Sequence, residues 1–189
     1  MKMKENAKEA ILAAARKAAM AYGYGGLNFR DIAETVGIKA ASINYHFPSK
    51  AALGEAVAKR YWEDTVVDLD AISTAAQDPV SALHRYPEIF RKSLASDNRI
   101  CLGSFMATEY DGLPEAVRKE VQTFADVNVA WLSKQLTATA MVTPAESEPR
   151  ARAIYAAVAG AQLMARGRSN ISLFDSLIES YRATGLLPA

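Results

Sequence analysis

The stretch "GIKAASINYHFPSK", which runs from Gly37 to Lys50, gathers many polar side chains into fourteen residues. Tyr45 offers a hydroxyl group on a rigid arm, which suits a phosphate oxygen. Lys50 offers an ammonium group and, at an expected helix start, a free backbone N–H, and both attract anions. Tyr45 and Lys50 are therefore candidates for contacts with the phosphate backbone of a nucleic acid.

Other side chains of the same stretch suit base edges. Asn44 can form two hydrogen bonds with adenine, and the small side chains of Ala40 and Ala41 can touch a thymine methyl group without blocking a close approach. Ser42 and Lys39 have the chemistry for either base edges or phosphates, and both alternatives stay open.

Two short helices must position these groups. Asn28 is a good N-cap for a helix through about Val36, and Gly37 is placed to end that helix in the left-handed conformation. A second helix is predicted over residues 40–46, and it ends before Pro48 because proline cannot continue a helix. Two short helices joined by a tight, glycine-containing turn predict a helix-turn-helix, whose second helix enters the major groove of DNA.

The rest of the chain also has helical periodicity, and no strand alternation or internal repeat is found. The further predicted elements are a helix over 4–22, a long helix over about 50–72, a segment that opens at Asp78-Pro79, a short segment that closes at Asp111-Gly112, a helix from Pro114 to about Ala140, and two helices over 150–166 and 172–184. We therefore predict an all-α fold of about nine helices, in which a long helix joins an N-terminal helix-turn-helix domain to a C-terminal bundle.

Charge is unevenly distributed along the 189 residues. Residues 1–62 carry ten Lys or Arg against five Asp or Glu, a balance of +5, and the remainder has a balance of −4. This asymmetry indicates that only the front part meets a polyanion. Lys2, Lys4 and Lys8 form either a phosphate-binding arm or a frayed terminus.

Several function classes are not expected. Charged residues follow the first methionine and no apolar run reaches about 18 residues, so we predict no signal peptide, no membrane span and a cytoplasmic location. The single cysteine, Cys101, excludes an internal disulfide and a thiolate cluster. No metal-ligand spacing, phosphate-cradling glycine loop or nucleophile with a base is found, so we predict neither enzymatic activity nor a cofactor or metal.

Many residues between Ala10 and Leu53 occur at offsets that a known family shares: Ala13, Ala14, Gly26, Asp31-Ile32-Ala33, Gly37, Ile38, Tyr45-His46-Phe47, Ser49, Lys50 and Leu53. Through these residues, the segment from Ala10 to Leu53 resembles the DNA-binding domain of the TetR family of bacterial transcription repressors. This segment is about a quarter of the chain. The resemblance implies a homodimer that binds a double-stranded DNA operator and releases it when a small-molecule effector binds. Residues 1–50 are then expected to be the DNA-binding domain, and residues 51–189 the ligand-binding and dimerisation domain.

Position by position, the resemblance implies DNA contacts from Asn28, Lys39, Ala40, Ala41, Ser42, Asn44, Tyr45, His46 and Lys50. His46 can instead cap the end of its helix. Threonine is commoner in the family at the position of Asn28, and a small serine-like residue at that of Lys39, so base preference cannot be carried over from a relative.

The part after Lys50 is rich in aromatic and sulfur-containing side chains. At helical spacing, such side chains build either plain core or the apolar wall of a small-molecule site between facing helices. The expected ligand-binding residues are Trp62, Tyr86, Phe90, Cys101, Phe105, Met106, Glu109, Phe124 and Trp131.

Cys101 supports an alternative function. Some members of the resembling family sense electrophiles or oxidants through a cysteine at a comparable helix start. Arg99 and a helix N-terminus could favour the thiolate here, whereas a lone cysteine between Ile100 and Leu102 could equally be a small buried hydrophobe. The alternative is therefore a redox-sensing or electrophile-sensing repressor that acts through Cys101.

The last two predicted helices carry small and apolar residues that allow close approach of helix axes. An apolar helix pair at the chain end predicts a four-helix interface between two subunits, although packing within one subunit is the alternative. The expected interface residues are Ala153, Ala157, Gly160, Ala161, Met164, Leu173 and Leu177.

Overall fold

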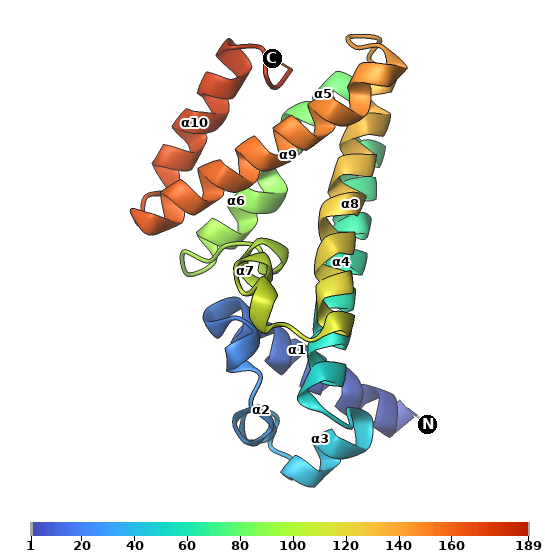
Figure 1. Cartoon of the computed structure of the whole chain (residues 1–189), viewed down its shortest axis with the longest axis vertical. Helices are drawn as coiled ribbons and strands as arrows, with labels where there is room; N and C mark the ends of the chain where they lie inside the picture. The colour runs from blue at the N-terminus through green and yellow to red at the C-terminus, as the bar shows by residue number, and fades with distance from the viewer. Residues whose placement is uncertain (1, 189) are drawn as a thin grey trace. The chain divides into compact units, whose positions relative to one another are not determined.

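The computed structural model describes residues 2–188, without the side chains of residues 2–5, so the predicted roles of Lys2 and Lys4 lie outside it. All regular elements in this range are helical, which confirms the predicted all-α class (Figure 1). They are α1 (Lys2–Tyr22), η1 (Tyr24–Gly26), α2 (Phe29–Val36), α3 (Ala40–His46), α4 (Lys50–Ala75), α5 (Pro79–Arg85), α6 (Glu88–Ala95), α7 (Leu102–Thr108), η2 (Tyr110–Gly112), α8 (Glu115–Ala138), α9 (Pro144–Gly167) and α10 (Ile171–Ala183).

The chain folds into two compact units. The N-terminal unit contains the residues up to Trp62 together with Leu102–Thr123, and the C-terminal unit contains Glu63–Cys101 and Phe124–Ala189. Helices α4 and α8 run from one unit into the other. The predicted functional boundary after residue 50 stays a prediction, but the compact unit around the helix-turn-helix extends further along the chain.

Local capping explains the helix-turn-helix. The side-chain oxygen of Asn28 accepts hydrogen bonds from the N–H groups of Arg30 and Asp31, at 2.8 and 3.4 Å, and so begins α2. Gly37 ends α2 with φ of 74°, in the left-handed region, as predicted. Ser49 Oγ accepts a hydrogen bond from the Ala52 N–H at 3.1 Å and begins α4.

Apolar side chains of α1 and α3 fix the orientation of the motif. Ile43 and Phe47 are 0 and 3% exposed, and Ile11 of α1 is also fully buried. Burying a side chain of this size stabilises the fold by about 1.5–3 kcal/mol. The ammonium group of Lys8 lies 5.9 Å from the centre of the Phe47 ring, so this lysine also contacts the motif.

Two predicted helix boundaries were wrong in the C-terminal unit. The single segment expected after Asp78 is divided into α5 and α6 at Pro87, which has no N–H to donate to a carbonyl of the preceding turn. The helix expected over 150–166 begins earlier, since α9 starts at Pro144. There the Glu146 carboxylate accepts hydrogen bonds from the backbone N–H and the hydroxyl of Thr143, at 2.9 and 2.7 Å, and this capping outweighs the helix-breaking effect of Pro149.

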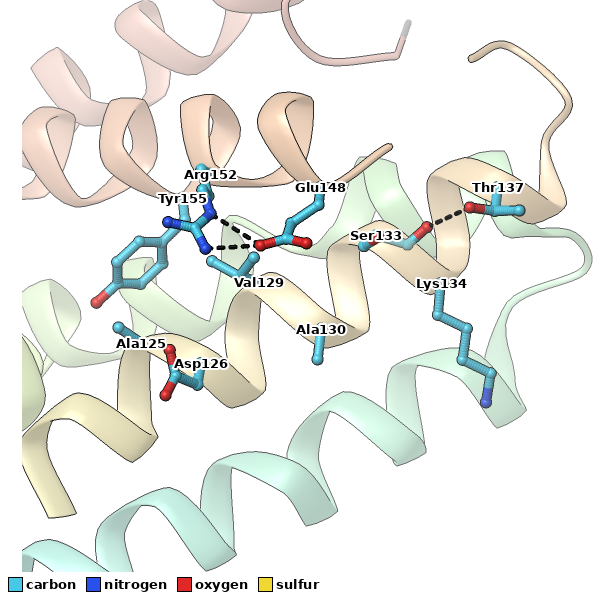
Figure 2. A pocket seen from close by; sticks show the side chains of 10 residues that line it. All are labelled: Ala125, Asp126, Val129, Ala130, Ser133, Lys134, Thr137, Glu148, Arg152 and Tyr155. Carbon is cyan, nitrogen blue, oxygen red and sulfur yellow. Dashed lines mark hydrogen bonds and ion pairs between the residues drawn. The ribbon is translucent and has the colours of Figure 1, made fainter. Parts of the chain in front are cut away.

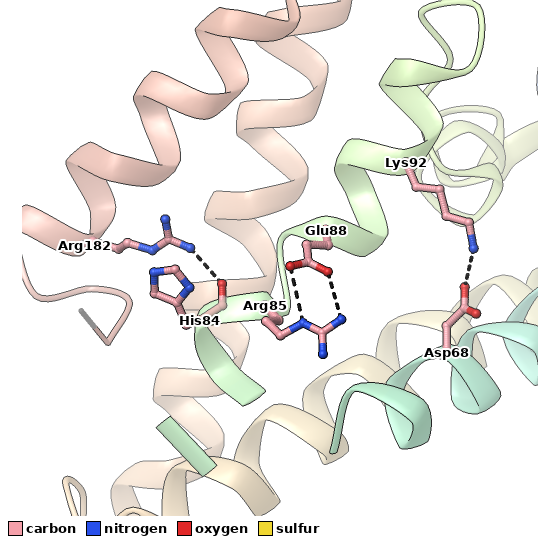
Figure 3. A network of polar contacts seen from close by, with 6 residues as sticks. All are labelled: Asp68, His84, Arg85, Glu88, Lys92 and Arg182. Carbon is pink, nitrogen blue, oxygen red and sulfur yellow. Dashed lines mark hydrogen bonds and ion pairs between the residues drawn. The ribbon is translucent and has the colours of Figure 1, made fainter. Parts of the chain in front are cut away.

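Helices α6, α9 and α10 pack against one another in the C-terminal unit. Figure 3 shows polar contacts at the surface of this unit: Lys92 of α6 pairs with Asp68 of α4 at 3.1 Å, and Arg182 of α10 donates to the backbone carbonyl of His84 in α5 at 2.7 Å. An exposed ion pair such as Lys92–Asp68 contributes little, about 0–1 kcal/mol. The unit is therefore held mainly by its apolar core.

Candidate nucleic-acid interface

Helix α3 buries one side and exposes the predicted contact residues on the other. Lys39, Ala40, Ala41, Ser42 and Asn44 are exposed. Tyr45 is 70% exposed, and its ring packs edge-on against the ring of His46, with centroids 5.2 Å apart. His46 is half-buried between Tyr45 and Phe47, so its ring supports the Tyr45 arm.

A shallow depression of about 420 Å³ brings together contact residues from three different helix ends. Asn28 before α2, Asn44 in α3 and Lys50 at the start of α4 all line it. The other lining residues, which are not among the expected DNA contacts, are Gly25, Leu27, Phe29 and Ser49. The amide groups of Asn28 and Asn44 and the ammonium group of Lys50 therefore lie around the same depression.

Asn28 and Lys50 are both oriented by contacts within the protein. The oxygen of the Asn28 side chain is engaged in the helix cap, so its N–H₂ group is the part that can be offered to an anion. The Lys50 ammonium lies 4.7 Å from the centre of the Tyr24 ring and 3.4 Å from the carbonyl oxygen of Gly25. Burial raises the pKa of the Tyr24 hydroxyl, which stays neutral beside the cation.

The nine expected ligand-binding residues are divided between the two compact units. Tyr86, Phe90, Cys101, Phe124 and Trp131 belong to the C-terminal unit, whereas the other four, Trp62, Phe105, Met106 and Glu109, belong to the N-terminal unit. In that N-terminal set, the Trp62 indole N–H donates to the Glu120 carboxylate at 2.7 Å, and the Glu109 carboxylate accepts from the Tyr24 N–H at 2.8 Å.

An aromatic cluster occupies the core of the C-terminal unit. Tyr86 stacks on Trp131 with ring centroids 5.7 Å apart and meets Phe90 edge-on at 5.7 Å. Tyr155, which is not among the expected ligand-binding residues, contacts Phe90 and Phe124, with ring centroids 6.1 and 6.4 Å apart. Four of the expected ligand-binding residues thus meet around Tyr155 and its neighbours.

Two buried amides add polar groups to this core. Asn128 is fully buried, accepts a hydrogen bond from the Tyr86 hydroxyl at 3.0 Å and donates to the Phe124 carbonyl at 2.8 Å. Burial raises the pKa of the Tyr86 hydroxyl well above its usual value. Sequence reasoning missed Asn128 because a single amide in an apolar helix carries no recognisable spacing.

The second buried amide, Gln162, lies beside Cys101, which directly precedes α7 and is fully buried. The Cys101 backbone N–H donates to the side-chain oxygen of Gln162 at 3.0 Å, and the Gln162 amide donates to the Phe90 carbonyl at 2.6 Å. Gln162 is itself fully buried. The side chain of Cys101 therefore lies in the packed interior.

A groove of about 830 Å³ runs between α8 and α9 (Figure 2). Arg152 and Glu148 of α9 form an ion pair at 2.6 Å on one side, while Lys134 and Asp126 extend from α8. Tyr155 also lines the groove and connects it with the aromatic cluster. None of the nine expected ligand-binding residues lines this groove.

The expected interface residues differ in exposure. Ala153, Gly160 and Met164 are exposed on α9, whereas Ala161 on the same helix is fully buried within the chain. Ala157, Leu173 and Leu177 are half-buried. Helix α9 therefore presents a stripe of small and apolar side chains, to which Leu163 adds a side chain that is 56% exposed.

Among residues 2–188, no helix has the length and apolar character needed to cross a membrane. Within the same range, no group of three or more His, Cys, Asp or Glu side chains is arranged to hold a metal ion.

Comparisons with known proteins place this geometry in a family. Residues 11–57 match the profile described as bacterial regulatory proteins, tetR family. The structure resembles a TetR transcriptional regulator from Legionella pneumophila, with 30% identity, a TM-score of 0.86, and 94% of this chain and 96% of that chain covered. A TetR-family transcriptional regulator from Agrobacterium tumefaciens gives 26% identity, a TM-score of 0.85 and the same coverage, 94% and 96%. Among curated protein sequences, none matches significantly.

Proposed function

The chain belongs to the TetR family of bacterial regulatory proteins, and from this premise we propose that it is a repressor that a small-molecule effector releases from its operator. The family makes it a DNA-binding transcriptional regulator. The observation that carries the proposal is the polar surface of α3, where Tyr45 is 70% exposed beside exposed Asn44 and Ser42. A solvated helix with no partner would not require this concentration of contact groups.

We assign roles within this surface by chemistry. Asn44, Ala40 and Ala41 face base edges, where an amide pairs with adenine and a methyl group contacts thymine. Tyr45 and Lys50 bind phosphates and set the register of the helix in the groove. These contacts fall within residues 1–50, which we propose as the functional DNA-binding domain.

The effector site is proposed for the C-terminal unit, at the α8–α9 groove and the aromatic cluster behind Tyr155. Its apolar floor, including Val129, and its charged rim, including Arg152 and Lys134, suit a small amphipathic molecule. A compound found by thermal-shift screening should bind the parent protein and fail to bind Ala130→Trp, which fills the groove. Equal binding to both proteins would place the effector elsewhere.

Dimerisation is proposed through the exposed stripe of α9 together with α10. Two recognition helices then fit successive major grooves, which lie about 34–36 Å apart. The effector must bind a state with a different spacing more tightly, because a ligand with equal affinity for both states shifts nothing. Helix α4 carries Lys50 at its start and continues into the C-terminal unit, so it is the proposed connection.

The alternative function, sensing through Cys101, has less support. Reactive thiols are at least partly exposed, and the Cys101 side chain is 0% exposed. If Cys101→Ser releases DNA in response to oxidants and thiol-reactive compounds as the parent does, the alternative is excluded.

Binding to DNA tests the proposed contacts. Tyr45→Ala and Lys50→Ala should lose affinity for a duplex that the parent protein selects from a random-sequence pool, with helicity and dimerisation intact. Tyr22→Ala is a matched control, since Tyr22 is 74% exposed and lies outside the motif. Equal losses in Tyr45→Ala and Tyr22→Ala would contradict the assigned interface.

A further inference from the structure

Tyr24 contacts the Lys50 side chain and restricts the position of its ammonium group. The Lys50 ammonium lies 4.7 Å from the centre of the Tyr24 ring, within the range of a cation–π contact. The same ammonium is 3.4 Å from the carbonyl oxygen of Gly25, the next residue. A lysine side chain has several rotatable bonds, so two contacts on its head group restrict where the charge lies.

The Tyr24 ring is itself held against α4. A Cβ atom added to Gly54 would lie 2.6 Å from Cε2 of the Tyr24 ring and 3.2 Å from a methyl carbon of Val117. Only a glycine therefore lets the ring pack so closely on the helix that begins with Lys50. The ring and the lysine that it contacts are both fixed relative to the same helix.

Glu109 fixes the backbone of Tyr24 from another part of the chain. Its carboxylate accepts a hydrogen bond from the Tyr24 N–H at 2.8 Å, across 85 residues of sequence. Gly23 makes room for the carboxylate, because a Cβ there would collide with Oε2 of Glu109, and its φ of 64° also favours glycine. Glu109 lies between α7 and η2, in the segment that leads into α8.

We propose that Tyr24 is a positioning residue for the phosphate contact of Lys50, and that Glu109 holds Tyr24 in place through the hydrogen bond to its backbone N–H. The inference rests on the proposed function, in which Lys50 binds phosphate. A lysine side chain that is already restricted in the free protein loses less conformational entropy on binding DNA than a mobile one. When the hydrogen bond from the Tyr24 N–H to Glu109 breaks, the Tyr24 ring becomes more mobile, and the contact of Lys50 with the DNA phosphate weakens. The segment from α7 to η2 thereby controls a DNA contact of the helix-turn-helix.

A double-mutant cycle separates this role from a general effect on folding. Operator affinity is measured for the parent, Tyr24→Leu, Lys50→Ala and the double variant, on a duplex selected by the parent from a random-sequence pool. Tyr24→Leu should weaken binding by about two- to fivefold for each subunit on the DNA. In the Lys50→Ala background the same change should have no effect, and Tyr24→Phe, which keeps the ring, should bind as the parent does. Independent losses that multiply in the double variant would overturn the inference.

Glu109 is tested in the same way. Glu109→Ala should weaken operator binding in the parent background and leave Lys50→Ala unaffected, whereas Glu109→Gln keeps an acceptor oxygen and should bind more tightly than Glu109→Ala. If Glu109→Ala and the parent have equal affinity for the operator, the proposed role of Glu109 is refuted. The parent protein separates the two levels: failure of the parent to bind any duplex rejects the proposed function, while normal parent binding with independent losses rejects only the positioning role.

Discussion

Replacing Asn28 with Asp should separate its role in the fold from its role on DNA. The Asn28 oxygen caps α2 through a hydrogen bond of 2.8 Å from the Arg30 N–H and a longer one of 3.4 Å from the Asp31 N–H. An Asp side chain has nearly the same shape, caps helices about as well, and its charge favours the positive end of the helix dipole. Asn28→Asp should therefore leave Tm unchanged or raise it slightly.

The same change should weaken DNA binding strongly. It removes the N–H₂ donor of Asn28 and places a negative charge where we expect phosphate oxygens. A hydrogen bond to a charged group contributes about 1.5–3 kcal/mol, which corresponds to about 10- to 150-fold in affinity, and charge repulsion adds to this loss.

Thermal denaturation and anisotropy titration of a labelled duplex measure the two effects in one set of variants. Asn28→Ala is the control: it removes the cap, at a cost of about 1 kcal/mol, and Tm should fall by about 2–4 °C. Parent-like DNA affinity of Asn28→Asp would refute the phosphate contact. A Tm of Asn28→Asp as low as that of Asn28→Ala would refute the capping role.

Three further predictions concern the C-terminal unit. Tyr86→Phe leaves the buried oxygen of Asn128 without its 3.0 Å hydrogen bond, so the free energy of unfolding should fall by about 1–3 kcal/mol in denaturant titration; an unchanged value would contradict the network. Hydrogen bonds from Arg91 lower the pKa of Asp175, so this pair stabilises the fold above the unfolded carboxyl pKa of about 4 and less as pH falls through the folded pKa. Disruption of the pair by Asp175→Asn should therefore lower Tm at neutral pH more than at acidic pH. An equal decrease at both pH values would contradict stabilisation by the charged pair. Met164→Glu places a charge on the exposed stripe of α9 and should shift sedimentation towards the monomer. An unchanged dimer would exclude this stripe as the interface.

The helix-turn-helix could be predicted closely because its boundaries are set by local chemistry. Asn28 caps α2, Gly37 ends it in the left-handed conformation, and α3 begins and ends at the expected residues, Ala40 and His46. Caps and turns depend on neighbours within a few residues, which the sequence displays directly.

The candidate ligand region could not be predicted in the same way, because it depends on which helix faces meet. The spacing of Phe105 and Phe90 gave no indication that they belong to different units. Tyr155 joins the aromatic cluster and the groove only after α9 packs in the C-terminal unit. The ligand-binding role of Glu109 stays a prediction, and no pattern in the sequence indicated that its carboxylate accepts a hydrogen bond from the Tyr24 N–H, 85 residues away.

The salt dependence of DNA binding tests the central claim most directly. Anisotropy titrations of the parent protein on its selected duplex, repeated at increasing salt, give the slope of log K against log[salt]. Lys50 is the cation among the proposed phosphate contacts, and one copy in each of two subunits predicts a linear decrease with a slope of about −1.8 or steeper. A flat slope, or no binding to any selected duplex, would contradict the claim that this surface binds DNA.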